Sequence, residues 1–277
     1  MNLVRTGANR KPPSFDAVID AVARGRPGAY WLIGNEPNVP GQDYDGVYLT
    51  NGVRDFASLR GSATRYVQAF RHYRSLIRAA DPTAHIVFGN FLNFDATCQA
   101  CGGFFSAHEY LNEVQLAFQR DWGEEIPSDV IWGIHVYLID WLNLPMIDSG
   151  MVPREIGLLR AYIDTMESRR GASIWLTEFG VIWGYPSRCE VDFKMTSCPD
   201  APFAEQETDN YLVTTLDWLS ANATALGIDR WYLFSNYALP EPFASVYGGI
   251  SLLDGPGPAA QLTRFGRTFL EYAQRGR

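Results

Sequence analysis

Short runs of apolar and β-branched residues alternate with longer stretches of helical periodicity along most of this chain. This alternation predicts repeated strand–helix units, in which neighbouring strands run parallel and helices cover the sheet. The helix-like stretches include residues 15–24, 62–80 and about 205–225, where apolar side chains recur every three or four positions. The strand-like runs lie at residues 2–6, 30–34, 85–90, 131–137, 173–177 and 230–234. The pattern therefore favours an α/β fold.

The length of 277 residues is close to that of one α/β barrel, which commonly has about 200–250 residues in a single domain. Hydrophobic residues make up 47% of the chain and charged residues 19%, which is enough for a large buried core. Since no linker or repeat divides the sequence, we expect one domain over residues 1–277. The longest loops follow strands, at residues 37–61, 91–106, 182–203 and 236–258. In a barrel these loops all lie at the C-terminal face, where active sites are built.

The charge of the chain excludes several classes of partner. The formal net charge is −8 and no basic run occurs, so neither nucleic acid nor an anionic membrane surface is an expected partner. No apolar run reaches the roughly 18 residues of a membrane span. The 8 Trp and 14 Tyr suit a carbohydrate substrate, because aromatic rings stack on the C–H faces of sugars.

Four cysteines occur as two local pairs in polar loops. Cys98 and Cys101 form a C-x2-C motif, and Cys189 and Cys198 bracket a second loop segment. This arrangement favours two disulfides in an exported protein, although the first residues show no signal-peptide pattern. A zinc site of four thiolates and free thiols are the alternatives.

Two glutamates stand where strand-like runs end. Residues 29–38 read AYWLIGNEPN, with Glu36 directly before Pro37, a residue that cannot continue a strand ladder. Residues 173–181 read SIWLTEFGV and carry Glu178. Both carboxylates are therefore expected on the C-terminal rim of one barrel. Retaining hydrolysis of a glycoside needs such a pair about 5–5.5 Å apart, one to protonate the leaving oxygen and one to attack the anomeric carbon.

Together with GIHVY at residues 133–137, these motifs resemble glycoside hydrolase clan A, the retaining "four-seven" TIM-barrel β-glycosidases. The resemblance extends from about residue 28 to the C-terminus and implies a TIM-type (β/α)8 barrel. It implies that Glu36, ending the fourth strand, is the acid/base and that Glu178, ending the seventh, is the nucleophile. Substrate-binding roles are implied for Asn35 at the sugar 2-hydroxyl, for His135 and Tyr137 on the sixth strand, and for Tyr237 in the eighth-strand segment.

Two further positions are less specific. Trp183 lies in the loop after Glu178, where both stacking on substrate and ordinary loop packing are open. Gln42 and Asp43 follow the first motif and could contact sugar hydroxyls.

The clan places three strands before its Asn-Glu-Pro motif, whereas residues 2–6 are the only strand candidate before Asn35 here. We therefore expect a barrel incomplete at its N-terminus, with strands three to eight. The expected function is a retaining glycoside hydrolase that cleaves β-linked oligo- or polysaccharide by double displacement, with no cofactor and no metal. The alternative is a non-catalytic, carbohydrate-binding or vestigial glycosidase-like barrel.

Overall fold

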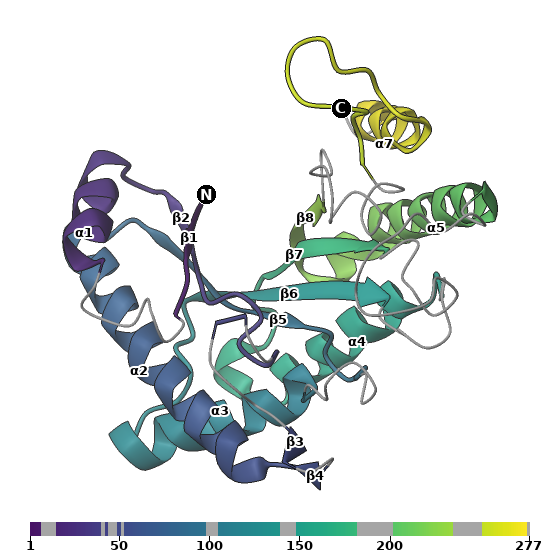
Figure 1. Cartoon of the computed structure of the whole chain (residues 1–277). Coiled ribbons are helices and arrows are strands. Elements are labelled where there is room, and N and C mark those ends of the chain that lie inside the picture. Colours follow the sequence, from purple (N-terminus) through teal and green to yellow (C-terminus); the bar gives the residue numbers. More distant parts are fainter. Residues whose placement is uncertain are drawn as a thin grey trace.

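Six parallel strands form one sheet in the computed structural model (Figure 1), in the order β1-β2-β5-β6-β7-β8. The structure describes residues 1–6, 15–39, 42–43, 49–50, 53–97, 105–138, 148–181, 202–234 and 251–275. The sheet strands are β1 (Asn2–Val4), β2 (Tyr30–Ile33), β5 (His85–Leu92), β6 (Val130–Leu138), β7 (Ile174–Val181) and β8 (Ile228–Leu233). A separate antiparallel pair, β3 (Leu49–Thr50) and β4 (Val53–Arg54), was not expected from the sequence.

Helices alternate with the sheet strands, and α2, α3 and α4 lie along one side of the sheet (Figure 1). The helices are α1 (Asp16–Gly25), α2 (Phe56–Ala80), α3 (Ala107–Trp122), α4 (Met151–Asp164), α5 (Pro202–Leu226) and α7 (Arg264–Arg275), with a short 3-10 helix, η3 (Glu167–Arg169). Parallel strands joined by covering helices confirm the expected fold, a partial TIM-type α/β barrel.

Local sequence signals explain where the longer helices begin and end. Asp55 caps α2, since its side chain accepts hydrogen bonds from the amides of Ala57 and Ser58. Ser106 and Glu109 form a capping box at the start of α3, which ends at Gly123 in a left-handed conformation. These signals place the helices close to the expected stretches.

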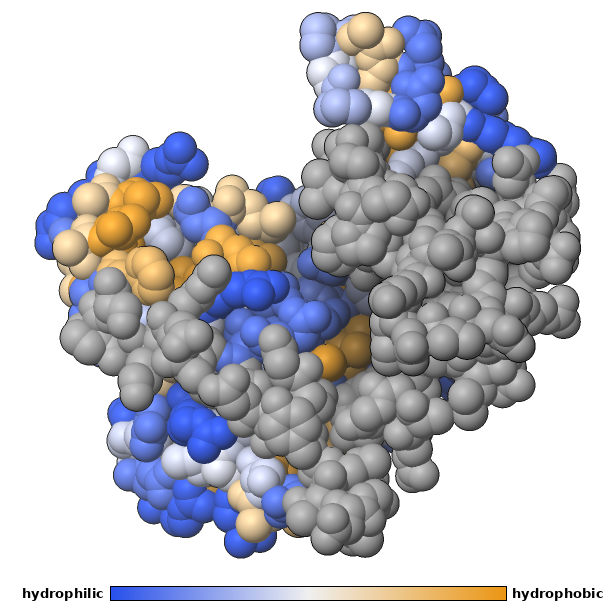
Figure 2. Space-filling view, viewed as in Figure 1, coloured by the Kyte–Doolittle hydropathy of each residue, from blue (hydrophilic) through white to orange (hydrophobic). Residues whose placement is uncertain are grey.

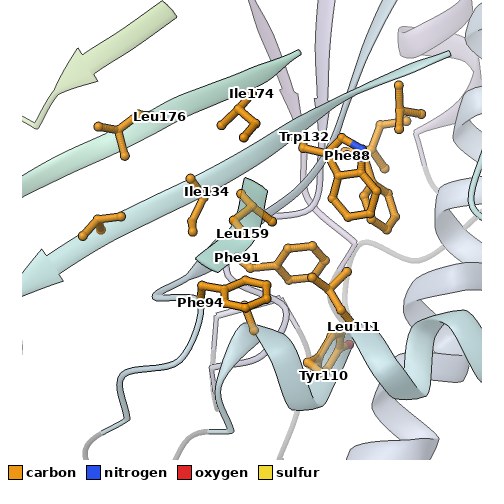
Figure 3. Close-up of a cluster of buried hydrophobic side chains, with 14 of the residues drawn as sticks. Phe88, Phe91, Phe94, Tyr110, Leu111, Trp132, Ile134, Leu159, Ile174 and Leu176 are labelled. Carbon is orange, nitrogen blue, oxygen red and sulfur yellow. The ribbon is translucent and has the colours of Figure 1, made fainter. Parts of the chain in front are cut away.

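The outer face of the sheet packs against the helices and forms the main core. Side chains on a strand alternate between the two faces of a sheet, so Phe88 and Trp132 point toward the helices while Val87 points the other way. Figure 3 shows this layer, in which aromatic rings from β5 and β6 meet Tyr110 and Leu111 of α3. Phe70 and Phe118 add further buried rings from α2 and α3.

The inner face is filled near the start of its strands by a cluster of rings. Tyr30 on β2 lies 4.6 Å from Trp175 on β7, measured between ring centroids, although β5 and β6 separate these strands in the sheet. The guanidinium of Arg230 lies over both rings, at 4.7 and 4.9 Å. Contacts across two intervening strands require a strongly curved sheet, as in a barrel.

The surface over α1 and beside β1 carries an apolar patch (Figure 2), where exposed side chains include Met1, Leu3, Phe15 and Val18. β1 is an edge strand of the described sheet. Within the described residues, no helix is both long and apolar enough to span a membrane.

The strand ends differ from those expected. β7 continues to Val181, so that Glu178 lies inside the strand rather than after it. The reason is continued pairing with β6, in which Glu178 is opposite His135 and Phe179 is opposite Val136. β5 likewise extends to Leu92.

Candidate active site

Glu36 lies in the turn that follows β2. Gly34 has a φ of 102° and Glu36 a φ of 50°, both in the left-handed region. For a non-glycine residue this backbone costs roughly 1–3 kcal/mol, and such residues concentrate at functional sites. The Glu36 amide donates a 2.9 Å hydrogen bond to the carbonyl of Asn90, and its carbonyl accepts from Val39 at 2.8 Å. The backbone of Glu36 is therefore held by β5 as well as by its own turn.

A buried tyrosine from α2 anchors the start of this turn. The hydroxyl of Tyr66 donates to the carbonyl of Ile33 at 3.0 Å and accepts from the amide of Gly89 at 2.9 Å. It thus stands between β2 and β5 just where their last register pair ends. A Cβ at Gly34 would lie 2.8 Å from the Tyr66 ring, so this position accepts only glycine while the ring stays in place.

Strands β6 and β7 bring three more groups to the same rim. Nδ1 of His135 lies 2.8 Å from Oε1 of Glu36 and 3.7 Å from Oε2 of Glu178. The hydroxyl of Tyr137 donates a 2.8 Å hydrogen bond to the same Oε2 of Glu178. One oxygen of each glutamate and one ring nitrogen of His135 all lie within 4.8 Å of one another. A register shift between Ile134 and His135 sets Glu178 opposite His135.

The two carboxylates differ in their access to solvent. The side chain of Glu178 is 29% exposed and that of Glu36 is 11% exposed, whereas His135 between them is 2% exposed. A molecule approaching from solvent can therefore reach Glu178 more easily than the other two groups.

Opposing effects act on the pKa of His135. Burial of the imidazole lowers its pKa, but the carboxylates of Glu178, Glu36 and Asp43 together outweigh this effect and raise it above its ordinary value. The site therefore favours a proton on His135, between two acidic groups.

Asp43 stabilises the turn after β2 and is buried, with 2% of the residue exposed. Its Oδ2 accepts hydrogen bonds from the Asn35 amide at 2.6 Å and from the Thr6 hydroxyl at 2.8 Å, which links the ends of β1 and β2. Burial raises the pKa of Asp43 despite these hydrogen bonds. A sugar contact for Asp43 is wrong, because its carboxylate faces protein. Gln42 is exposed, and its Oε1 accepts from Nδ2 of Asn35 at 3.3 Å.

The structure brings together five of the residues singled out from the sequence: Asn35, Glu36, His135, Tyr137 and Glu178. Trp183 and Tyr237 lie outside the described residues, as do the four cysteines Cys98, Cys101, Cys189 and Cys198. The expected roles of these six residues stay predictions.

Sequence reasoning missed the buried asparagines that hold the rim. Asn90 accepts from the Glu36 amide through its carbonyl, and its side chain donates to the carbonyl of Gly34 at 2.9 Å. Asn90 and Asn93 have positive φ angles of 50° and 43°. A signal was present, since residues 34–38 and 89–93 share the pattern G-N-x-x-N.

The cluster of Glu36, His135 and Glu178 offers two oxygens and one nitrogen, a donor set that suits a divalent cation. However, Nδ1 of His135 is at hydrogen-bond distance from Glu36, and Oε2 of Glu178 already accepts from Tyr137. These hydrogen bonds use Nδ1 of His135, Oε1 of Glu36 and Oε2 of Glu178, and they favour proton chemistry at this site.

Comparisons with known proteins agree with the fold. No family model matches the sequence, and no curated protein matches it. Among solved structures, the virulence factor SghA in complex with its substrate analog salicin matches with a TM-score of 0.52 and 13% identity, over 94% of this chain and 66% of that one. The catalytic core of xylanase A has a TM-score of 0.49 and 18% identity, over 84% and 63%. A β-glucosidase from Exiguobacterium marinum has a TM-score of 0.49 and 14% identity, over 88% and 64%.

The chain thus spans about two thirds of the length of each of these three structures. At 13% identity the likeness to SghA shows a shared fold alone, and the names of the three structures describe those proteins. The structural neighbours also include glycoside hydrolases of family 44 and family 5. The fold is therefore a partial TIM-type α/β barrel.

Proposed function

We propose that this chain is a retaining glycoside hydrolase that cleaves β-linked oligo- or polysaccharides by double displacement. The observation that carries the proposal is the spacing of Glu36 and Glu178, whose oxygens lie within 4.8 Å of each other across His135. Retaining enzymes place their two carboxyl groups about 5–5.5 Å apart, whereas inverting enzymes leave room for a water between them, about 6.5–9.5 Å. The short spacing supports the retaining mechanism.

In the first step, Glu178 attacks the anomeric carbon with Oε1 while the Tyr137 hydroxyl donates to Oε2. The bond between the anomeric carbon and the leaving oxygen breaks, and Glu36 gives its proton to that oxygen. The greater exposure of Glu178 suits a group that must touch the sugar ring, and the shielding of Glu36 suits a proton donor.

In this scheme Glu36 receives the proton for the first step from His135, whose pKa is raised by the neighbouring carboxylates. Moving a proton from protonated His135 to ionised Glu36 leaves the total number of protons in the site unchanged. The proton can move from Nδ1 to Glu36 along their 2.8 Å hydrogen bond.

In the second step, Glu36 takes a proton from water, and the water oxygen attacks the anomeric carbon. The ester bond to Glu178 breaks, which restores both carboxyl groups. The backbone N–H of Asn35 donates to Asp43, and in this scheme the side chain of Asn35, next to Glu36, contacts the sugar 2-hydroxyl. The steps use the side chains of this chain and need no cofactor.

Replacing each carboxylate by its amide tests the proposal with aryl β-glycosides. Glu178→Gln should lower kcat by at least about a thousandfold, because the nucleophile is lost from a group of residues that act together. Glu36→Gln should lower it by about 10²–10⁴-fold with a poor leaving group and by much less in the first step with an activated one. Glu109→Gln, at the start of α3, is the matched control, because glutamine also completes a capping box.

The stereochemistry of the first product, read by proton NMR, decides the mechanism. A product that first appears as the β-anomer supports double displacement, and a first-formed α-anomer would exclude it. Binding of β-linked oligosaccharides with no turnover, unchanged in both amide variants, would instead support a non-catalytic carbohydrate-binding barrel.

A further inference from the structure

The pattern G-N-x-x-N occurs at the carboxyl ends of two neighbouring strands. Residues 34–38 follow β2 and residues 89–93 end β5, and these strands are paired in the sheet. The first glycine of each segment has a similar left-handed backbone, with φ of 102° at Gly34 and 93° at Gly89. The two strands therefore leave the sheet in related ways.

The last asparagine of each segment makes the same contact with the next strand. Asn38 donates from Nδ2 to the carbonyl of Leu92 at 2.9 Å and accepts from its amide at 3.0 Å. Asn93 donates from Nδ2 to the carbonyl of Tyr137 at 3.0 Å and accepts from its amide at 2.9 Å. Both asparagines are buried, with at most 1% exposed. Each side-chain amide thus makes the two hydrogen bonds to one residue of the next strand that a backbone peptide group of a paired strand would make.

The side chain of Asn93 continues the hydrogen bonding to β6 just after the backbone of β5 ends at Leu92. Its own amide still donates to the carbonyl of His135 at 2.9 Å, but its φ of 43° turns the chain away. Its carbonyl then accepts from Ala107 at the start of α3. Without the side-chain amide, the amide and carbonyl of Tyr137 would lose their contacts with β5. Since the residue is buried, that loss would be costly.

The hydrogen bonds from Asn93 affect the candidate site through the side chain of Tyr137. Tyr137 is the residue whose hydroxyl holds Glu178 at 2.8 Å, and its ring stands edge-on to that of Phe234 at 6.1 Å. Asn93 fixes both backbone groups of this tyrosine, whereas the equivalent contact of Asn38 fixes Leu92.

We propose that Asn93 is a positioning residue, which places the Tyr137 hydroxyl on Glu178 by binding both backbone groups of Tyr137. The proposal rests on the proposed glycosidase function. The backbone amide of Asn93 binds the carbonyl of His135, whereas its side chain reaches Glu178 only through Tyr137.

A double-mutant cycle tests the proposal with an aryl β-glycoside. Asn93→Gly removes the amide and leaves the positive φ unstrained. We expect kcat to fall by about 10–100-fold, the order of effect of displacing a group in the site, with a smaller change in KM. In a Tyr137→Phe background the hydroxyl is already absent, so Asn93→Gly should change kcat by less than about twofold.

Asn38→Gly is the control, because it removes the corresponding pair of hydrogen bonds from Leu92, together with one more to the carbonyl of Phe105. Its effect on kcat should be the same in the wild-type and Tyr137→Phe backgrounds. If Asn93→Gly also has equal effects in both backgrounds, or has none in the wild type, Asn93 does not act through Tyr137 and the proposal is overturned.

Two measurements keep the result decisive if Asn93→Gly does not fold or if the wild type has no activity. Asn93→Asp keeps the acceptor for the Tyr137 amide and loses the donor to its carbonyl, so its cycle with Tyr137→Phe should show the same coupling. Hydrogen exchange at the Tyr137 amide should become faster in Asn93→Gly, should change less in Asn93→Asp, which keeps the acceptor, and should stay unchanged in Asn38→Gly. An inactive wild type would refute the glycosidase function alone, while unchanged exchange would refute the placement of Tyr137 by Asn93.

Discussion

Removing the hydroxyl of Tyr66 measures how strongly β2 and β5 are held together beside the candidate site. It lies between β2 and β5, and it is the partner of the Ile33 carbonyl and of the Gly89 amide in a fully buried position. Tyr66→Phe keeps the ring that packs against Phe88 and removes only this oxygen. Each of the two backbone groups left without this partner costs about 1–3 kcal/mol, so we expect the free energy of unfolding to fall by about 2–6 kcal/mol.

Urea unfolding followed by circular dichroism measures this change, with the slope m unchanged if the variant unfolds in the same way. The control is Tyr272→Phe on α7, where the lost hydroxyl donates to Asp217 at 2.7 Å on the surface. A surface change of this kind should stay within about 0.5 kcal/mol. A loss below about 1 kcal/mol at Tyr66 would show that β2 and β5 close up and bond each other directly, and would refute the reasoning.

Three further predictions concern protons, metals and thiols. Because the folded pKa of His135 is raised, its stabilising effect is complete below its unfolded value of about 6.5 and is lost as the pH rises through the folded value. Urea titrations of the wild type and His135→Gln should therefore differ more at pH 5.5 than at pH 8.5; a difference that grows with pH would contradict the assignment. Incubation with a chelator such as EDTA should leave aryl β-glycoside hydrolysis unchanged, and loss of activity restored by a divalent metal would show that the cluster binds a cation. Denatured protein should show no free thiols before reduction and four afterwards, whereas four thiols with release of zinc would favour the alternative site, at Cys98, Cys101, Cys189 and Cys198.

The sequence predicted the elements of the barrel because their signals are local. Apolar residues at alternating positions fit a strand, and a three- or four-residue period fits a helix. The run at residues 30–33 became β2, and the stretch ending at residue 80 became α2. The motif around Glu36 also predicted a turn, since Pro37 stops the ladder. The end of β7 was wrong by several residues, because its continued pairing depends on β6.

The tertiary structure decided how the functional groups meet. Glu36 and His135 are 99 residues apart in the chain, and their 2.8 Å contact depends on the curvature of the sheet. A register shift between β6 and β7 sets Glu178 opposite the same histidine. The role of Asn93 was also hidden, since an asparagine in a loop is ordinarily exposed, and here it binds the backbone of the next strand. Local patterns determine which face a side chain occupies, whereas distances of a few ångströms depend on how separate strands are aligned. The sequence alone therefore determined which carboxylates stand on the rim, and only the fold decided that they share one histidine.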